Sequence, residues 1–134
     1  MKSLSKYIFV LCAIALFAVS SCDTDNDITP DQDVRASYLG TWLSTEQSGM
    51  TYSVNITLDP ANSTQIYIGN FHFLGANEKA YAIATSNNLT FPSQVICGNT
   101  IHGLGNLVSN NKITLKYYVN NQTDIDTINA TYTK

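Results

Sequence analysis

Apolar and polar residues alternate along most of the chain after residue 38. The alternation is clearest in three stretches, 52–58, 113–119 and 128–132. Successive side chains of a β-strand point to opposite faces of the sheet, so a period of two predicts strands with one buried face. No stretch after residue 30 repeats apolar residues at helical spacing. The pattern therefore predicts an all-β domain.

The parity of the alternation changes once, between residues 66 and 73. Ile66 and Ile68 share one face, whereas Phe71 and Phe73 fall on the other. One extra residue in a strand produces such a change, and Gly69–Asn70 is the natural place for it. We therefore expect one long strand here, with a bulge in the middle.

Turn-forming residues such as Ser48–Gly49, 59–63 and Asn110–Asn111 separate the runs. Asparagine and glycine tolerate the backbone conformations of tight hairpin turns. The count is about eight short strands, and we expect an eight-stranded antiparallel up-and-down barrel, because closure leaves no unpaired sheet edge. A β-sandwich is the alternative. Gly103 and Gly105 favour the barrel, since glycines on one strand face allow sharp bending or close packing.

The N-terminus has the layout of a secretory signal. Lys2 and Lys6 precede an apolar run over 7–19, which is shorter than the about 20 residues of a membrane-spanning helix. The run ends in 19–22, Val-Ser-Ser-Cys, which resembles the lipobox of bacterial lipoproteins. The resemblance implies cleavage after residue 21 and lipid attachment to Cys22. The alternative is an ordinary cysteine beside another cleavage site.

Three segments follow from this layout. Residues 1–21 form the signal peptide, 22–36 an acidic flexible linker, and 37–134 the barrel domain. The acidic start of the linker, 23–27, is similar to the surface-export signal of Bacteroidota lipoproteins. We therefore expect an outer-membrane lipoprotein of the cell envelope. The domain then faces either the periplasm or the cell surface.

The domain also resembles the calycin barrels, and more closely the small calycin-like or lipocalin-like lipoprotein domains of Bacteroidota. The resemblance covers residues 36–134. Its motifs are the lipobox, Gly40-Thr41-Trp42 in the first strand, the Gly103-x-Gly105 strand, and the stretches 111–117 and 130–134. The chain departs from these families in lacking a lid helix and a C-terminal helix. No late arginine covers the tryptophan, so Lys116 or Lys134 would have to serve.

Trp42 is predicted to seal one end of the barrel. Gly40 leaves room for the indole to lie across the barrel floor, and a large aromatic buries about 150–250 Å². The alternative is a role in stacking against a ligand.

Charge and cysteine content narrow the function further. The chain carries 10 acidic and 7 basic residues without a basic run, which argues against nucleic-acid binding. Cys97 is the one thiol of the barrel domain, and we expect it to be a small buried side chain on a strand. Five acids fall near strand ends and turns, where charge is normally solvated: Glu46, Asp59, Glu78, Asp124 and Asp126.

No catalytic or metal-binding motif stands out. His72 and His102 are isolated and fall on predicted strands, and no metal-ligand spacing or nucleophile elbow occurs. We expect neither a catalytic site, nor a metal site, nor a cofactor. An enzyme would instead bring at least two titratable side chains into one cleft.

The prediction is a non-catalytic barrel that binds a small apolar molecule or a sugar. Five inward residues are the candidate ligand contacts: Trp42, Tyr52, Ile56, Leu115 and Tyr117. Outward Tyr67 and Tyr118 are candidates for a sugar-stacking strip. The alternative is a structural or interaction module, an accessory subunit or an inhibitor, with a filled core and function on loops 59–64 and 74–79. An eight-stranded barrel is just wide enough for its side chains to fill.

Overall fold

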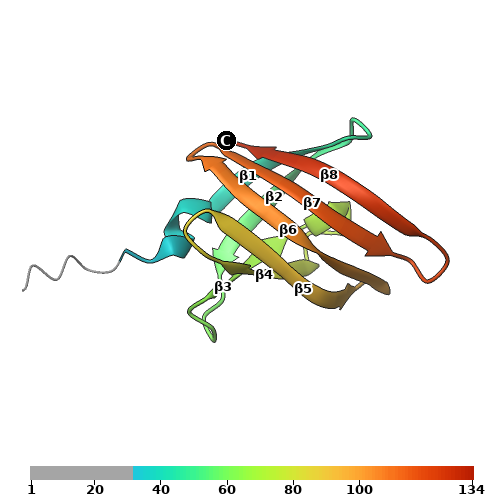
Figure 1. Ribbon diagram of the computed structural model, residues 1–134, viewed down its shortest axis with the longest axis horizontal. Helices are drawn as coiled ribbons and strands as arrows, with labels where there is room; N and C mark the ends of the chain where they lie inside the picture. Colours follow the sequence, from blue (N-terminus) through green and yellow to red (C-terminus); the bar gives the residue numbers. More distant parts are fainter. Residues whose placement is uncertain (1–31) are drawn as a thin grey trace, which may run out of the picture. The chain divides into compact units, whose positions relative to one another are not determined.

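The computed structural model describes residues 32–134 (Figure 1). Two short 3₁₀ helices, η1 (Val34–Tyr38) and η2 (Phe71–Phe73), precede β1 and follow β3. The eight strands are β1 (Gly40–Glu46), β2 (Thr51–Leu58), β3 (Gln65–Gly69), β4 (Lys79–Ala84), β5 (Asn88–Ile96), β6 (Asn99–Ser109), β7 (Lys112–Asn120) and β8 (Ile125–Thr133).

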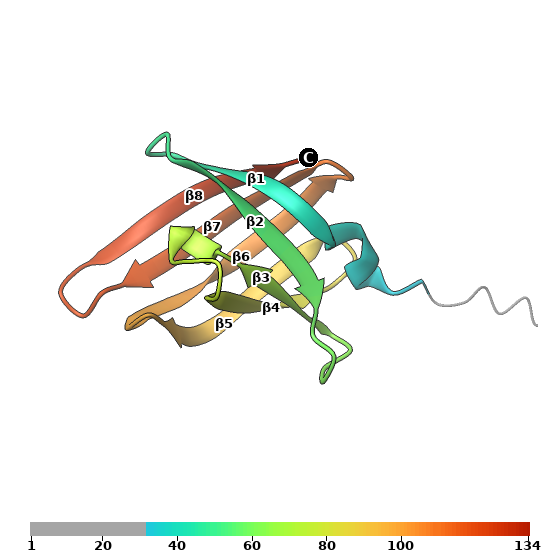
Figure 2. The same cartoon turned by 180° about the vertical axis from the view of Figure 1, so that it is seen from behind.

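The strands close into one barrel. Each strand pairs antiparallel with the next, and β8 pairs with β1 through the register Leu43 to Thr133 and Glu46 to Ala130 (Figures 1 and 2). The prediction of an eight-stranded up-and-down barrel is therefore confirmed, and the β-sandwich alternative is excluded. Because every strand has two neighbours, the sheet has no free edge.

The seam between β4 and β5 is held in an unusual way. The two strands share only the pairs Ile83–Thr90 and Ala84–Leu89 before they diverge. Beyond that point the Gln94 carboxamide accepts a hydrogen bond from the Tyr81 N–H and donates one to the Tyr81 carbonyl, each at 2.8 Å. This side chain takes the place of a backbone peptide group, so both main-chain groups of Tyr81 are satisfied.

Two glycines allow close packing across β6 and β7. A β-carbon placed on Gly103 would lie 2.5 Å from Cβ of Tyr117, and one placed on Gly105 would lie 2.5 Å from Cδ2 of Leu115. Such separations are far inside van der Waals contact. The sequence-based reading of these glycines as sites of close approach agrees with this geometry.

Inward side chains fill the barrel with one core cluster. In β1, Trp42, Ser44 and Glu46 are buried and the residues between them are exposed, as the period of two requires. The cluster combines aromatic rings from the helices and the strands with aliphatic side chains from every part of the sheet. Its largest fully buried members are Trp42, Tyr38, Tyr117, Tyr132, Phe71 and Phe91.

The predicted long strand over 66–73 is wrong in its second half. β3 ends at Gly69, and Asn70 adopts the left-handed conformation with φ of 58°. The chain then leaves the sheet in η2, the short yellow-green helix that connects β3 to β4 in Figure 2. Phe71 enters the core, while Phe73 is 62% exposed. The change of parity therefore marks the end of a strand and not a bulge. His72 accordingly lies in η2 and not on a strand.

Cys97 is exposed, contrary to the expectation of a buried strand residue. It forms the turn between β5 and β6 together with Gly98, and both residues have positive φ, 49° and 78°. Such a pair is typical of a tight hairpin turn, whose tip necessarily faces solvent.

The helix η1 begins before the predicted domain boundary at residue 37. Asp33 caps η1, and Arg35 and Tyr38 of this helix are buried. Residues 33–36 thus pack with the barrel, although they were assigned to the linker. The signal peptide, Cys22 and the rest of the linker up to residue 31 lie outside the described residues. Within 32–134, no helix is both long enough and apolar enough to cross a bilayer.

Candidate functional site

One end of the barrel, here called the tryptophan end, is sealed by Trp42 and η1. The indole Nε1 donates to the carbonyl of Tyr38 at 2.7 Å, and the Tyr38 hydroxyl donates to the carbonyl of Thr85 at 2.9 Å. Lys134 covers the indole, with its Nζ 4.3 Å from the ring centroid and 2.9 Å from the carbonyl of Leu39. Of the two predicted lysines, Lys134 therefore takes this place.

Gly40, at the start of β1, contributes to the tryptophan end through its backbone conformation. Its φ is 108°, a value that other residues rarely adopt. A β-carbon there would meet nothing nearer than the Lys134 side chain at 3.9 Å. The expectation that Gly40 makes room for the indole is thus wrong, and the glycine is required by the turn of the chain into β1.

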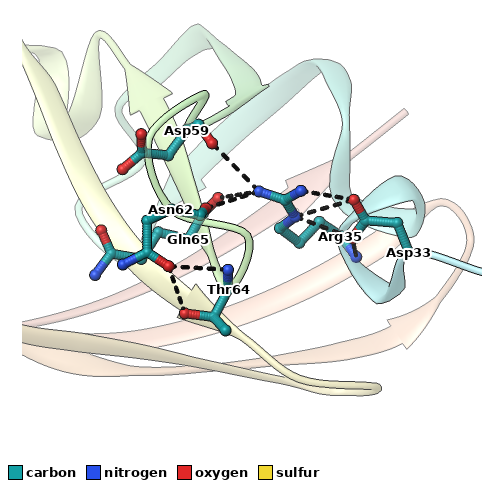
Figure 3. Close-up of polar contacts among 6 residues, drawn as sticks. All are labelled: Asp33, Arg35, Asp59, Asn62, Thr64 and Gln65. Carbon is teal, nitrogen blue, oxygen red and sulfur yellow. Dashed lines mark hydrogen bonds and ion pairs between the residues drawn. The ribbon is translucent and has the colours of Figure 1, made fainter.

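Arg35 ties η1 to the β2–β3 loop (Figure 3). Its Nη1 donates to the carbonyls of Asp59, Asn62 and Gln65 at 3.4, 2.9 and 3.1 Å. Its Nε and Nη2 bind the Asp33 carboxylate, the shortest contact being 2.7 Å. The Arg35 guanidinium holds the pKa of Asp33 below its ordinary value. We call Asp33, Arg35 and the three carbonyls the arginine clasp.

The opposite end, here called the polar end, contains a buried carboxylate. Glu46 is 4% exposed, and its Oε1 accepts hydrogen bonds from the hydroxyls of Tyr52 at 2.6 Å and Tyr117 at 2.9 Å. His72 places Nδ1 2.9 Å from the same oxygen and 3.0 Å from the Tyr117 hydroxyl. We call Glu46, Tyr52, His72 and Tyr117 the Glu46 cluster. The expectation that Glu46 is a solvated charge is wrong, and Asp59 is likewise buried.

Two further hydroxyls are buried next to this cluster without a hydrogen-bond partner. They are Ser44 Oγ and Tyr132 OH, which belong to residues paired across β1 and β8. Burial raises the pKa of Tyr132, and the nearby Tyr52 and Glu46 add to the effect. Burial also raises the pKa of Tyr52. An unsatisfied buried hydroxyl costs about 1–3 kcal/mol, so native proteins seldom keep two together.

The segment that carries His72 has a strained backbone. Asn70, His72 and Phe73 have φ of 58°, 53° and 57°. Left-handed φ values in residues other than glycine are uncommon and often accompany functional sites. The His72 side chain is 21% exposed, whereas that of Glu46 is 3% exposed. His72 therefore lies between the Glu46 carboxylate and solvent.

The five predicted ligand contacts lie in the core. Tyr52 is 6% exposed, Leu115 4%, Trp42 and Ile56 1%, and Tyr117 0%. Tyr52 and Tyr117 belong to the Glu46 cluster, whereas Trp42 belongs to the tryptophan end. A ligand at an open mouth would not reach these side chains without a rearrangement. Ligand contact by the five residues stays a prediction.

The outer face of the barrel carries a groove of about 740 Å³ across β5, β6, β7, β8 and β1, whose exposed lining is more apolar than polar and includes Glu46 and Leu115. We call it the outer groove. Its outward side chains are mostly amides and hydroxyls, with Leu104 and Lys116 among them. They include Thr45, Gln47, Asn88, Asn106, Thr114, Asn129 and Thr131. Such a lining offers both donors and acceptors of hydrogen bonds with little charge.

An aromatic shelf adjoins the outer groove. His102 on β6 and Tyr118 on β7 stack with ring centroids 4.9 Å apart and planes 18° apart. They line a hollow of about 430 Å³ that shares Leu104 and Lys116 with the groove. Tyr67 lies on β3, four strands away around the barrel, with Lys79 Nζ 5.4 Å from its ring. The predicted strip of Tyr67 and Tyr118 therefore does not form, and His102 is the stacking partner of Tyr118.

Metal binding finds no support in the part of the chain that the structure describes. Residues 32–134 contain no group of three or more His, Cys, Asp or Glu side chains placed to hold a metal ion. Glu46 and His72 do bring two titratable side chains together, a convergence that the sequence analysis set as the mark of an enzyme. The Glu46 carboxylate and the His72 ring meet beneath η2, inside the barrel, where Glu46 is buried.

Comparison with known proteins supports the fold and identifies no family. No protein-family model matches the chain, and neither does any curated protein. Among solved structures, a redesigned β-barrel is similar with a TM-score of 0.53 and 13% identity, over 76% of this chain and 95% of that one. The protein EF1p2_mFAP2b, solved bound to DFHBI, is similar with a TM-score of 0.50 and 11% identity, over 76% and 97%. This chain thus belongs to the closed β-barrels by fold.

Proposed function

We propose that the chain is a membrane-anchored lipoprotein outside the cytoplasm, and that its barrel is a non-catalytic module that binds a neutral carbohydrate in the outer groove. The stacked pair of His102 and Tyr118 beside a concave surface of amides and hydroxyls is the observation that carries the proposal. Sugars present hydroxyls at their edges and C–H groups on their faces, and this surface offers partners for both.

The filled interior favours a sugar over an apolar ligand. The candidate inner contacts are at most 6% exposed, so an apolar molecule has no open apolar mouth to enter among them. Lys116 is the one charged side chain that the outward lining of the groove contributes. Neutral polar ligands fit such a lining better than anionic ones. EF1p2_mFAP2b, which was solved with DFHBI, shares the fold and supports a small-molecule role for barrels of this size.

Removal of one shelf ring tests the carbohydrate site. The full chain, purified in detergent from the membrane fraction, is titrated calorimetrically with maltohexaose, xylohexaose and mannohexaose. We expect one of them to bind, and Tyr118→Ala to weaken its binding about tenfold, because a ring contact contributes about 0.5–1.5 kcal/mol. Tyr67→Ala, which removes a comparable outward ring elsewhere, is the matched control. Equal affinities for the two variants would place the ligand elsewhere.

The anchor is tested separately. Cys22→Ala is expected to release the protein from the membrane fraction, because lipid chains supply about 0.8 kcal/mol per buried methylene. Cys97→Ala removes a thiol from an exposed turn and should leave the protein in that fraction. Tight membrane association of Cys22→Ala would contradict the lipoprotein proposal.

A protein partner is the second candidate, and exposed apolar side chains favour it. Val95, Leu104 and Phe73 are 69%, 63% and 62% exposed. The arginine clasp also holds the 59–64 loop in one conformation, as a recognition loop requires. Crosslinking of the anchored protein in intact envelopes, with and without Phe73→Ser, tests this alternative. A crosslinked species that Phe73→Ser removes would support it.

A further inference from the structure

The Glu46 cluster lacks a permanent cation. Within residues 32–134, the recorded ion pairs are those of Asp33 with Arg35 and of Glu46 with His72. A carboxylate that is 4% exposed requires compensation by a positive charge or by hydrogen bonds, because burial removes its hydration. His72 is the one basic side chain in contact with it. The hydroxyls of Tyr52 and Tyr117 supply part of this compensation, and a cation next to Oε1 would supply more.

Aromatic side chains surround Glu46 and His72. The Tyr117 ring lies edge-on to the His72 ring at 5.6 Å and 83°, and the Tyr52 ring packs against Phe73 at 5.6 Å. Tyrosine rings attract a cation near their faces, and their hydroxyls accept N–H bonds. Tyr132 OH and Ser44 Oγ are buried beside them without partners. Both could accept a hydrogen bond from the second N–H group of an imidazolium ligand.

The side chain of His72 shows which chemical group fits next to Glu46. An imidazole ring already places one nitrogen 2.9 Å from Glu46 Oε1 and 3.0 Å from the Tyr117 hydroxyl. It enters from η2, outside the sheet, on a backbone segment with three left-handed residues. The segment is thus held in place partly by the contact of His72 with Glu46. An external cation that makes the same contact would free the segment from its strained conformation.

We propose that the polar end is a binding site for a small organic cation of the imidazolium type, and that His72 occupies this site in the unliganded protein. The ligand displaces His72, donates to Glu46 and the Tyr117 hydroxyl, and packs against the Tyr117 ring as the His72 ring does. Glu46 also contributes to the lining of the outer groove, whereas the stacked rings of His102 and Tyr118 do not belong to the Glu46 cluster, so variants of these rings test the two proposals separately.

The probe is 4-methylimidazole, which is the histidine side chain without its backbone. The full chain in detergent is titrated calorimetrically, and the His72 ring resonances are followed by NMR. We expect saturable binding, with the His72 resonances moving towards those of a solvent-exposed histidine. His72→Ala should bind more tightly than the unmodified chain, because the competing ring is gone. Methylguanidinium and methylammonium define the selectivity of the site.

Substitutions in the Glu46 cluster test whether the cation binds at this carboxylate. Glu46→Gln in the His72→Ala background should weaken binding about ten- to hundredfold, because a charge-assisted hydrogen bond is lost. Tyr117→Phe, which removes one hydroxyl and keeps the ring, gives a second measurement if Glu46→Gln fails to fold. Tyr118→Ala should bind the cation normally, which separates this proposal from the carbohydrate site. Binding by the His72→Ala variant alone, binding that survives Glu46→Gln, or no binding at all would overturn the proposal.

Discussion

The two ends of the barrel differ in how their buried polar groups are paired. At the tryptophan end, the indole of Trp42 and the hydroxyl of Tyr38 each donate to a backbone carbonyl, and Lys134 covers the ring. At the polar end, three donors converge on one oxygen of Glu46, while Tyr132 OH has no partner. The segment above Glu46 also has a strained backbone.

This difference concerns the features that normally stabilise a single fold. A sequence that specifies a single fold satisfies its buried polar groups and keeps its backbone relaxed, and departures from these rules gather at functional sites. The buried polar groups of the tryptophan end, Arg35 included, have hydrogen-bond partners. The polar end departs from the rules in unpaired hydroxyls and left-handed backbone together. The comparison therefore identifies the polar end as the place where stability has been given up.

The largest expected effect is at the tryptophan end. Trp42→Ala should lower the free energy of unfolding by about 3–5 kcal/mol, because it removes a fully buried aromatic and leaves a cavity. Urea denaturation followed by circular dichroism measures it. Leu43→Ala, at the adjacent outward position that is 47% exposed, is the control and should change stability by about 0.5 kcal/mol or less. Similar losses for the two variants would mean that the indole does not seal the barrel.

A pair of tyrosine variants compares the ends directly. Tyr38→Phe should cost about 0.5–1.5 kcal/mol, because the Thr85 carbonyl loses its donor. Tyr132→Phe removes a buried hydroxyl that has no partner and should raise the free energy of unfolding by about 1 kcal/mol. Both substitutions delete one oxygen, so denaturation curves can be compared without a volume correction. Equal losses at the two positions would show that the polar end is satisfied after all.

The smallest effect concerns acid stability at the arginine clasp. The pKa of Asp33 is lower in the folded chain than its ordinary value of 3.8, so the stabilisation is complete above that value and is lost as the pH falls through the folded pKa. Asp33→Asn should therefore have a shallower loss of stability than the unmodified chain below about pH 4. Asp126→Asn, at an exposed position on β8, is the control. Parallel acid profiles for all three proteins would contradict this role of Asp33.

Much of the fold was predictable, because alternation is a local signal. The strands at 52–58, 113–119 and 128–132 lie where the period of two placed them, and pairing them without free edges left few arrangements. The turn at Cys97–Gly98 was missed although it contains a glycine. The departure of η2 from the sheet depends on Phe71 entering the core, and a local pattern cannot show that.

The candidate site was harder to predict, for two separate reasons. Glu46 was within reach of the sequence, because Trp42, Ser44 and Glu46 share the inward face of one strand, and an acid at an inward position signals a buried site. The contact of Glu46 with His72 could not be predicted from the sequence, since 26 residues separate the two along the chain. The arginine clasp is equally long-range: Arg35 contacts carbonyls up to 30 residues away, and backbone acceptors carry no sequence signal.

The seam at Gln94 gives the barrel a chemical weak point. One carboxamide supplies both a donor and an acceptor to Tyr81 where β5 has turned away. Hydrolysis of this amide to a carboxylate would keep the size of the side chain and delete the donor, so two oxygens would then face each other across the gap. Such chemical ageing of one side chain would loosen the barrel along the seam between β4 and β5.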